Sequence, residues 1–170
     1  VLETTPETSG TLQLNQSGVN VNYTLTNRTG NWGFTNTSIG EGVYLVTFYI
    51  NDSANNLNAS VTTTISIDTT APSVLSVRVN TSVDKHPNNM FNLTSIVTDT
   101  NRVDGNVNAS GNSGATNISL TLKEANNFTA ETNGTVLGCP ANGVCTITVY
   151  ARDAAGNLAS ATTTITAASA

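Results

Sequence analysis

Apolar and polar residues alternate along much of this chain, and the alternation predicts β-strands rather than helices. Between positions 43 and 50, the apolar residues of one parity are Tyr44, Val46, Phe48 and Ile50. Successive side chains of a strand point to opposite faces, so these residues share one face. No helical apolar period is sustained anywhere in the sequence. The pattern places strands near 11–15, 19–26, 32–36, 43–50, 60–67, 73–80, 90–98, 117–123, 128–137, 144–151 and 160–167.

One segment of the chain occurs twice, about 100 residues apart. Residues 42–66 read GVYLVTFYINDSANNLNASVTTTIS, and residues 143–166 read GVCTITVYARDAAGNLASATTTIT. Each copy is an alternating strand, a turn with Asp, Asn or Gly, and a second strand rich in Thr. Two copies of one supersecondary unit predict two tandem β-domains, at 1–70 and 71–170. The joint falls at 69–72, because Pro72 cannot donate to a strand ladder and keeps its predecessor extended.

The repeated segment resembles the prokaryotic Ig-like repeats of bacterial and archaeal surface proteins. Those repeats commonly end in a tract like G-x-Y-x-V-x-V-x-A-x-D-x-A-G-N and a Thr-rich last strand, and D-T-T-A-P at 68–72 is similar to the joint before a next repeat. The resemblance covers 42–76 and 143–166 and is weak before them. It implies an all-β chain of two tandem Ig-like β-sandwich domains in an extracellular setting, and by itself it implies no activity.

Under this resemblance, the tract E-G-V-Y at 41–44 is similar to a tyrosine corner, in which the Tyr44 hydroxyl bonds to the backbone just upstream. Cys145 stands at the equivalent place in the second copy, and Cys139 precedes it in the same loop. In an exported chain, two cysteines this close predict a disulfide that fixes the same corner and contributes about 2 kcal/mol. The alternative is a redox or metal pair, but two thiols alone do not fill a tetrahedral zinc site, and His86 is the only histidine.

The chain carries twelve Asn-X-Ser/Thr sequons, whereas its Asn, Ser and Thr content would give about six by chance. Accidental pairing in an Asn- and Thr-rich chain is the alternative explanation, and strand phase tests it independently. Strand parity places Asn22, Asn80, Asn92 and Asn117 on the face opposite their apolar neighbours, where a glycan can be attached. The sequence therefore predicts a secreted, N-glycosylated surface with acceptors at Asn15, Asn22, Asn27, Asn36, Asn51, Asn58, Asn80, Asn92, Asn108, Asn117, Asn127 and Asn133.

Composition excludes several classes of partner. Charged residues make up 10% of the chain and its net charge is −5, so N-linked glycans would supply the missing hydrophilicity. No apolar run is long enough to span a membrane, and the start at Val1 without a Met suggests a processed form or an excised fragment. So few ionised groups also suggest tolerance of acid. Nucleic acid is a poor partner, because the basic residues are scattered: Arg28, Arg78, Lys85, Arg102, Lys123 and Arg152.

Catalysis finds little support, and we expect no enzyme, no cofactor and no metal. A nucleophilic triad would have to use His86, which lies in the polar loop D-K-H-P-N-N. The tract 99–106 is similar to an acidic calcium loop, but Val103 stands where its fifth-position ligand belongs. Calcium held by Asp68, Asp99 and Asp104 is the alternative to an ordinary turn. A Lys–Asn isopeptide cross-link would need Lys85 or Lys123.

Two classes of function compete. The first is a structural subunit of an extracellular filament or surface layer, archaeal because dense sequons accompany Ig-like repeats, with another copy of itself as partner. The second is a ligand-binding adhesin or an accessory Ig-like module of a larger secreted protein. An adhesin needs an exposed aromatic patch, and Trp32 and Phe34 fill a core more readily than they form a platform.

The first domain is too short for a seven-stranded sandwich and lacks its opening one or two strands. Such a gap exposes core side chains and unpaired backbone groups. Truncation of a longer repeat array is one explanation. The other is donor-strand complementation, in which a neighbour's strand completes the sheet and subunits polymerise head to tail. We favour the second, with Val1–Gly18 as donor and Leu12 and Leu14 as its anchors.

Overall fold

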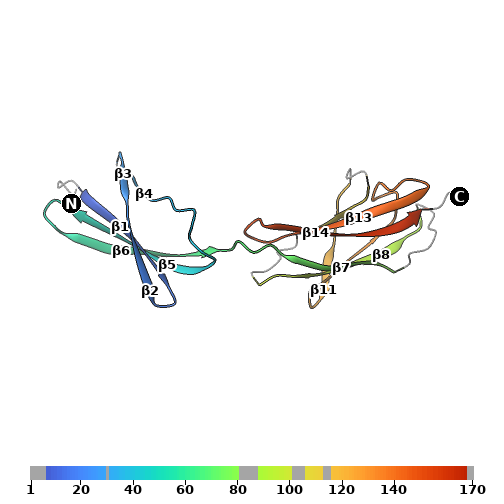
Figure 1. Cartoon of the computed structure of the whole chain (residues 1–170), viewed down its shortest axis with the longest axis horizontal. Helices are drawn as coiled ribbons and strands as arrows, with labels where there is room; N and C mark the ends of the chain where they lie inside the picture. The colour runs from blue at the N-terminus through green and yellow to red at the C-terminus, as the bar shows by residue number, and fades with distance from the viewer. Residues whose placement is uncertain (1–6, 30, 81–87, 101–105, 113–115, 168–170) are drawn as a thin grey trace. The chain divides into compact units, whose positions relative to one another are not determined.

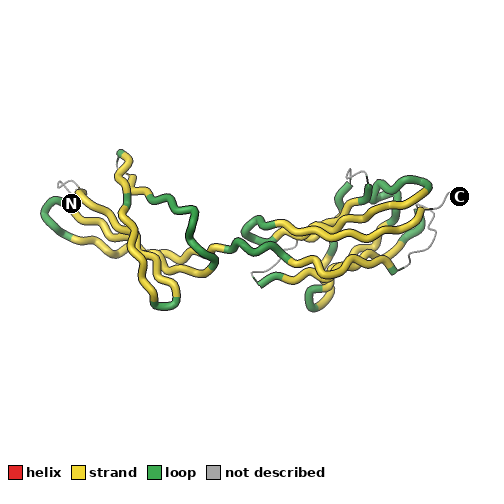
Figure 2. The backbone as a smooth tube through the Cα atoms, in the orientation of Figure 1, coloured by secondary structure: helices red, strands yellow, loops and turns green. Residues whose placement is uncertain are grey.

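The computed structural model describes residues 7–29, 31–80, 88–100, 106–112 and 116–167 (Figure 1). Every regular element in these ranges is a β-strand, as Figure 2 shows, which confirms the all-β prediction. The chain divides into two compact units, Val1–Asp68 and Thr69–Ala170. Both units have Ig-like β-architecture.

The first unit is built around one four-stranded antiparallel sheet in the order β2-β1-β5-β6. A short two-stranded hairpin, β3–β4, follows β2 in the chain. The strands are β1 (Glu7–Gln16), β2 (Val19–Thr24), β3 (Thr26–Arg28), β4 (Asn31–Gly33), β5 (Gly42–Asp52) and β6 (Leu57–Ile67).

The second unit is a sandwich of two four-stranded sheets, in the orders β10-β9-β13-β14 and β11-β12-β8-β7. Its core lies between the sheets and includes Phe91, Leu93, Val107, Phe128 and Ile147. The strands are β7 (Ser73–Val79), β8 (Phe91–Thr98), β9 (Asn106–Ser110), β10 (Ile118–Ser119), β11 (Thr121–Glu124), β12 (Asn127–Thr132), β13 (Gly143–Arg152) and β14 (Leu158–Ala167).

The sheet of the first unit corresponds strand for strand to the sheet β10-β9-β13-β14 of the second. The chain even leaves the two sheets in the same way. The Leu25 N–H donates to the Gly10 carbonyl over 2.8 Å, and the Leu120 N–H donates to the Val107 carbonyl over the same distance. In the second unit, β7 and β8 cover the inner face of this sheet, and the described part of the first unit contains no counterpart to them.

Burial reflects this difference. In β13 the inward side chains of Ile147, Val149 and Ala151 are fully buried, because a second sheet lies against them. In the first unit the equivalent Val46 is buried, whereas Phe48 and Ile50 are only half-buried. The buried core of the first unit is correspondingly small: its cluster consists of Leu14, Tyr44 and Val46 with partly buried neighbours, and Leu25 is buried as well.

The prediction of a single strand over 117–123 is wrong. The segment forms two short strands, β10 and β11, that belong to different sheets, and the chain crosses between the sheets at the buried Leu120. Leu122, which a single strand would place on the same face as Leu120, is therefore 55% exposed. The predicted strand 19–26 is divided in the same way at Leu25, between β2 and β3.

Two further expectations differ from the structure. The strand β9 was not expected, and the predicted strand 128–137 ends at Thr132, before a turn that spans 134–138. The donor hypothesis for Val1–Gly18 is wrong over β1, which pairs with β2 on one side and β5 on the other within its own unit. Residues 1–6 lie outside the described residues.

Candidate functional site

The twelve sequon asparagines all lie in described segments, and none of them is buried. The predicted exposure is confirmed for Asn22, Asn80, Asn92 and Asn117. Asn27 and Asn58 are exposed as well. The half-buried sites are Asn15, Asn36, Asn51, Asn108, Asn127 and Asn133. Attachment of sugar at these residues stays a prediction, and exposure makes it sterically feasible.

The sequons of the first unit are arranged unevenly over its sheet. The pairing register puts Asn15, Asn22 and Asn51 on the outer face, beside Gln13, Thr47 and Tyr49. The inner face contains the opposite parity, and its central rows are mainly apolar. One row is Val21–Leu14–Val46–Thr63, and the next is Tyr23–Leu12–Phe48–Val61. Neither row contains a sequon asparagine, but Asn58 pairs with the inward Ile50 in the next row of the same face.

This inner face is incompletely covered, and we name it the open face of the first unit. Val61 on β6 is 58% exposed, and Val19 and Val21 on β2 are 66% and 45% exposed. Val19 and Val21 also line a groove of about 180 Å³ between β2 and the segment 38–40. Trp32 and Phe34 are half-buried: Phe34 stacks on Tyr23 with ring centroids 4.5 Å apart, and Trp32 packs over Gly10. These two aromatics therefore cover only one part of the face.

The two units fix the same corner with different chemistry. The Tyr44 hydroxyl donates to the Gly40 carbonyl over 2.9 Å, which confirms the predicted tyrosine corner. In the second unit, Cys145 replaces the tyrosine and forms a disulfide with Cys139, with Cα atoms 5.3 Å apart. Both cysteines of the chain are used in this bond. The disulfide prediction is confirmed.

A buried carboxylate organises each of the two repeated turns. Asp52 and Asp153 are 8% and 2% exposed. Asp153 accepts from both the backbone N–H and the side-chain amide of Asn157 at 2.8 Å, and Asp52 accepts from Asn56 in the same way. Burial alone would raise the pKa of the Asp153 carboxyl, but the hydrogen bonds from Asn157 and the neighbouring backbone outweigh it and lower the pKa. These carboxylates have a structural role.

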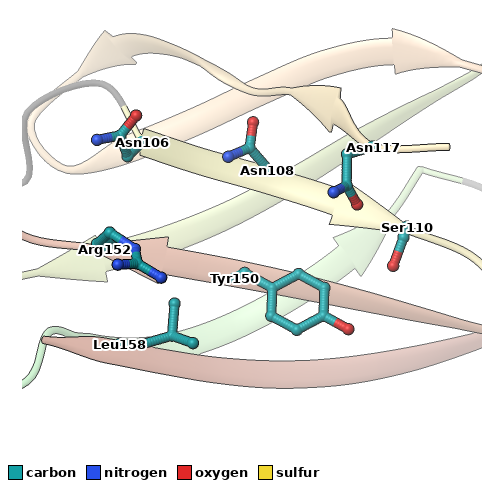
Figure 3. A pocket seen from close by; sticks show the side chains of 7 residues that line it. All are labelled: Asn106, Asn108, Ser110, Asn117, Tyr150, Arg152 and Leu158. Carbon is teal, nitrogen blue, oxygen red and sulfur yellow. The ribbon is translucent and has the colours of Figure 1, made fainter. Parts of the chain in front are cut away.

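A groove of about 420 Å³ lies on the outer face of the sheet β10-β9-β13-β14 (Figure 3). Figure 3 shows the ring of Tyr150 in the middle of the lining side chains. The sequence analysis missed this site. The available signal was that Tyr150 falls on the polar parity of its strand, as Tyr49 does in the first copy. The polar and apolar residues around the ring include Asn106, Asn108, Asn117, Arg152 and Leu158.

Several candidates for chemistry fall on segments that the structure does not describe. His86, Lys85 and Asp104 lie outside the described residues. Within the described ranges, no group of three His, Cys, Asp or Glu side chains is placed to hold a metal ion. No helix in those ranges is both long and apolar enough to cross a membrane.

Comparison with protein-family models gives a match to the first unit. Residues 1–69 match the family model described as a bacterial Ig-like domain. The curated proteins contain no match to the chain.

Comparison with solved structures supports the fold. Fibronectin(III)-like modules of Clostridium thermocellum CbhA are similar, with a TM-score of 0.51 and 17% identity over 99% of this chain and 82% of that one. A tetra-tandem repeat from the extending region of a large adhesion protein gives 0.45 and 20%, over 96% of this chain and 42% of that one. A 1.5-MDa bacterial ice-binding adhesin gives 0.40 and 15%, over 96% and 54%. At these identities the first similarity establishes the Ig-like fold and nothing about activity.

Proposed function

We propose that this chain is a structural subunit of an extracellular, N-glycosylated filament or surface layer, in which another copy of the chain is its partner. The observation that carries the proposal is the open face of the first unit, which is mainly apolar and incompletely covered, with a single sequon asparagine, Asn58, in its described part, opposite Ile50. We propose an archaeal cell surface as its setting and assign it no enzymatic activity.

The open face favours a protein partner because its burial is incomplete. Removing apolar area from water stabilises a folded protein by about 25 cal/mol per Å². Val19, Val21 and Val61 are exposed, so a partner that covered them would stabilise the first unit further. In the second unit, the equivalent face is sealed by β7 and β8. A β-segment from a neighbouring subunit, with apolar residues at alternate positions, would complete the first unit in the same way.

The structure restricts the choice of donor. Leu12 and Leu14, which we had expected to anchor a donor strand, belong to the acceptor, because β1 lies in the middle of the sheet. The donor must resemble β8 of the second unit, where Phe91, Leu93 and Val97 alternate on the buried face. Every strand in the described ranges is paired within its own unit, so these strands are not free donors.

The distribution of sequons fits such an assembly. Glycans at Asn15, Asn22 and Asn51 would cover the outer face of the first unit and leave the rows of Leu12 and Leu14 on the open face clear for a protein contact, whereas Asn58 lies in the next row, opposite Ile50. Glycans are large and hydrated, so a face that carries them is a poor interface. A chain with 10% charged residues gains its solubility from this coat.

An accessory Ig-like module of a larger secreted protein is the second candidate. The match of residues 1–69 to a bacterial Ig-like domain and the similarity in fold to fibronectin(III)-like modules favour it. Under this alternative, the open face would be covered by a segment of the same polypeptide, and isolated chains would not polymerise.

Thiol labelling distinguishes the two candidates. Both native cysteines are in the disulfide, so an introduced cysteine is a unique target for a maleimide. We expect Val61→Cys to be protected in native assemblies and reactive in dissociated subunits, because a donor strand covers it only in the assembly. Thr62→Cys is the matched control, since this neighbouring, exposed side chain points to the other face and should react in both states.

Equal labelling of Val61→Cys in both states contradicts donor-strand complementation. Electron micrographs of the same native material should contain filaments or a lattice, whereas discrete particles favour the accessory module. Intact mass tests the glycoprotein part separately, because each occupied sequon adds one glycan. Bare asparagine at most of the twelve sites contradicts that part.

A further inference from the structure

The groove around Tyr150 is not needed for the fold of the second unit, because it lies on the outer face of its sheet. Tyr150 is half-buried, and its ring lies between Asn108 and Asn117 on one side and Leu158 on the other (Figure 3). The groove is shallow and wide, so it does not enclose an apolar ligand. It offers one aromatic face with amide and guanidinium groups around it.

That combination of groups suits a sugar ring. A pyranose has an apolar face of C–H bonds, which carry a partial positive charge, and the face of an aromatic ring is negative. The hydroxyls at the rim of the sugar are both donors and acceptors, which the amide of Asn106 and the guanidinium of Arg152 can match. A flat apolar ligand would leave these polar groups without partners, and burying them in that way is costly.

The sequence places a sugar attachment point directly opposite the ring. Asn108, in the sequon N-A-S, is the cross-strand partner of Tyr150. Cross-strand partners have Cβ atoms roughly 5 Å apart, within the length of a single sugar residue. The Ser119 hydroxyl donates to the Asn108 Oδ1 over 3.1 Å, which orients the amide. Asn117, a second sequon, lines the same groove.

We propose that the groove is a binding site for a sugar ring, and that its ligand is the first part of the glycan attached to Asn108, stacked on Tyr150. This inference rests on the N-glycosylation proposed above. A tethered ligand has an effective concentration of about 1 mM, so a weak contact is enough to keep the sugar in the groove. The bound glycan then stabilises the second unit and stiffens its surface.

The test is a double-mutant cycle in the glycosylated protein, with Tyr150→Val and Asn108→Gln alone and together. We expect Tyr150→Val to lower the Tm by about 4 °C more when Asn108 is present than when it is Gln, a shift typical of one modest side-chain interaction in a chain of this size. The matched control replaces Asn108→Gln with Asn92→Gln. Asn92 is an exposed sequon on the other sheet, in a groove whose lining includes no aromatic residue, so its removal should leave the Tyr150 effect unchanged.

Nuclear magnetic resonance distinguishes a sugar contact of Tyr150 from a purely structural role. The protons of the first sugar at Asn108 should show an upfield ring-current shift that disappears in Tyr150→Val, and the sugar at Asn92 should show none. Released glycan added to Asn108→Gln distinguishes the source of the sugar. Saturable shifts of the Tyr150 ring, together with no ring-current shift of the sugar at Asn108, would support the sugar site and assign its ligand to another glycan chain.

The proposal is overturned if the Tm effects of Tyr150→Val and Asn108→Gln are additive, no ring-current shift is seen and released glycan does not bind. The mass of the native protein separates this failure from that of the proposed function. If other sequons carry sugar but Asn108 does not, and released glycan does not bind, the groove proposal is overturned and the proposed function is not. A chain without any sugar overturns both.

Discussion

At the scale of single residues, the two copies of the repeated turn have different residues at a position where the backbone φ is positive. The position before the last turn asparagine is Asn55 in the first copy and Gly156 in the second, and both have positive φ, of 66° and 97°. Glycine adopts this region without cost, and asparagine is among the few other residues that tolerate it. A Cβ on Gly156 would meet no atom within 4 Å, so any penalty there is conformational rather than steric.

We therefore expect Gly156→Val to lower the free energy of unfolding by about 1–2 kcal/mol and Gly156→Asn to cost clearly less. Urea unfolding of the full chain measures both. The asparagine variant is the matched control, because it adds a side chain but keeps a residue that the first copy already uses at this place. Equal losses for the two variants would contradict a conformational origin.

The sequence predicted individual side chains well where one strand stays in one sheet. Asn22 and Asn92 are exposed as parity requires, and Tyr44 makes the expected corner bond. Leu122 was misplaced because parity holds only while the chain stays in one sheet, and the chain leaves its sheet at Leu120. The Tyr150 groove was missed for a related reason, since Asn108 lies opposite Tyr150 only through a long-range pairing that the local sequence does not encode.

At the scale of elements, the hairpins β5–β6 and β13–β14 were predictable because long apolar alternation and a repeated turn agree. The strand β9 was not, since Val107 and Ala109 are its only inward residues and give little pattern. Both are nevertheless fully buried, because neighbouring β13 supplies the pairing edge. Tertiary context, rather than β-propensity, fixes this strand.

The disulfide is the second element-scale feature that can be tested. Cys145 is fully buried, so Cys139→Ala removes the cross-link while a thiol of similar size stays in the core. We expect a loss of about 2 kcal/mol in the free energy of unfolding, measured by urea denaturation, because the cross-link restricts the unfolded chain. Reductant should bring the wild type to the level of the variant and leave the variant unchanged. A variant as stable as the oxidised wild type would contradict this.

At the scale of the whole molecule, the sparse charge of the chain sets its response to pH. Its 170 residues include one histidine, so almost nothing titrates between about pH 5 and 8 and we expect constant stability there. Acid is different, because Asp153 is buried, accepts hydrogen bonds as a carboxylate, and has a lowered pKa in the folded state. The expectation of acid tolerance from low charge alone therefore neglects a carboxylate that the fold uses.

The sign of the effect follows from proton linkage. A group whose pKa is lower in the folded state binds fewer protons there, so its stabilisation is complete above the unfolded-state pKa of about 3.9. The stabilisation is lost as the pH falls from there through the folded-state pKa. Asp153→Asn cannot ionise, so its deficit in the free energy of unfolding relative to the wild type should be constant from pH 7 to 5 and shrink below about pH 4. Urea unfolding of both proteins at pH 7, 5, 3 and 2 measures this difference, and a deficit that stays constant down to pH 2 would mean that the carboxylate charge contributes nothing to holding the turn.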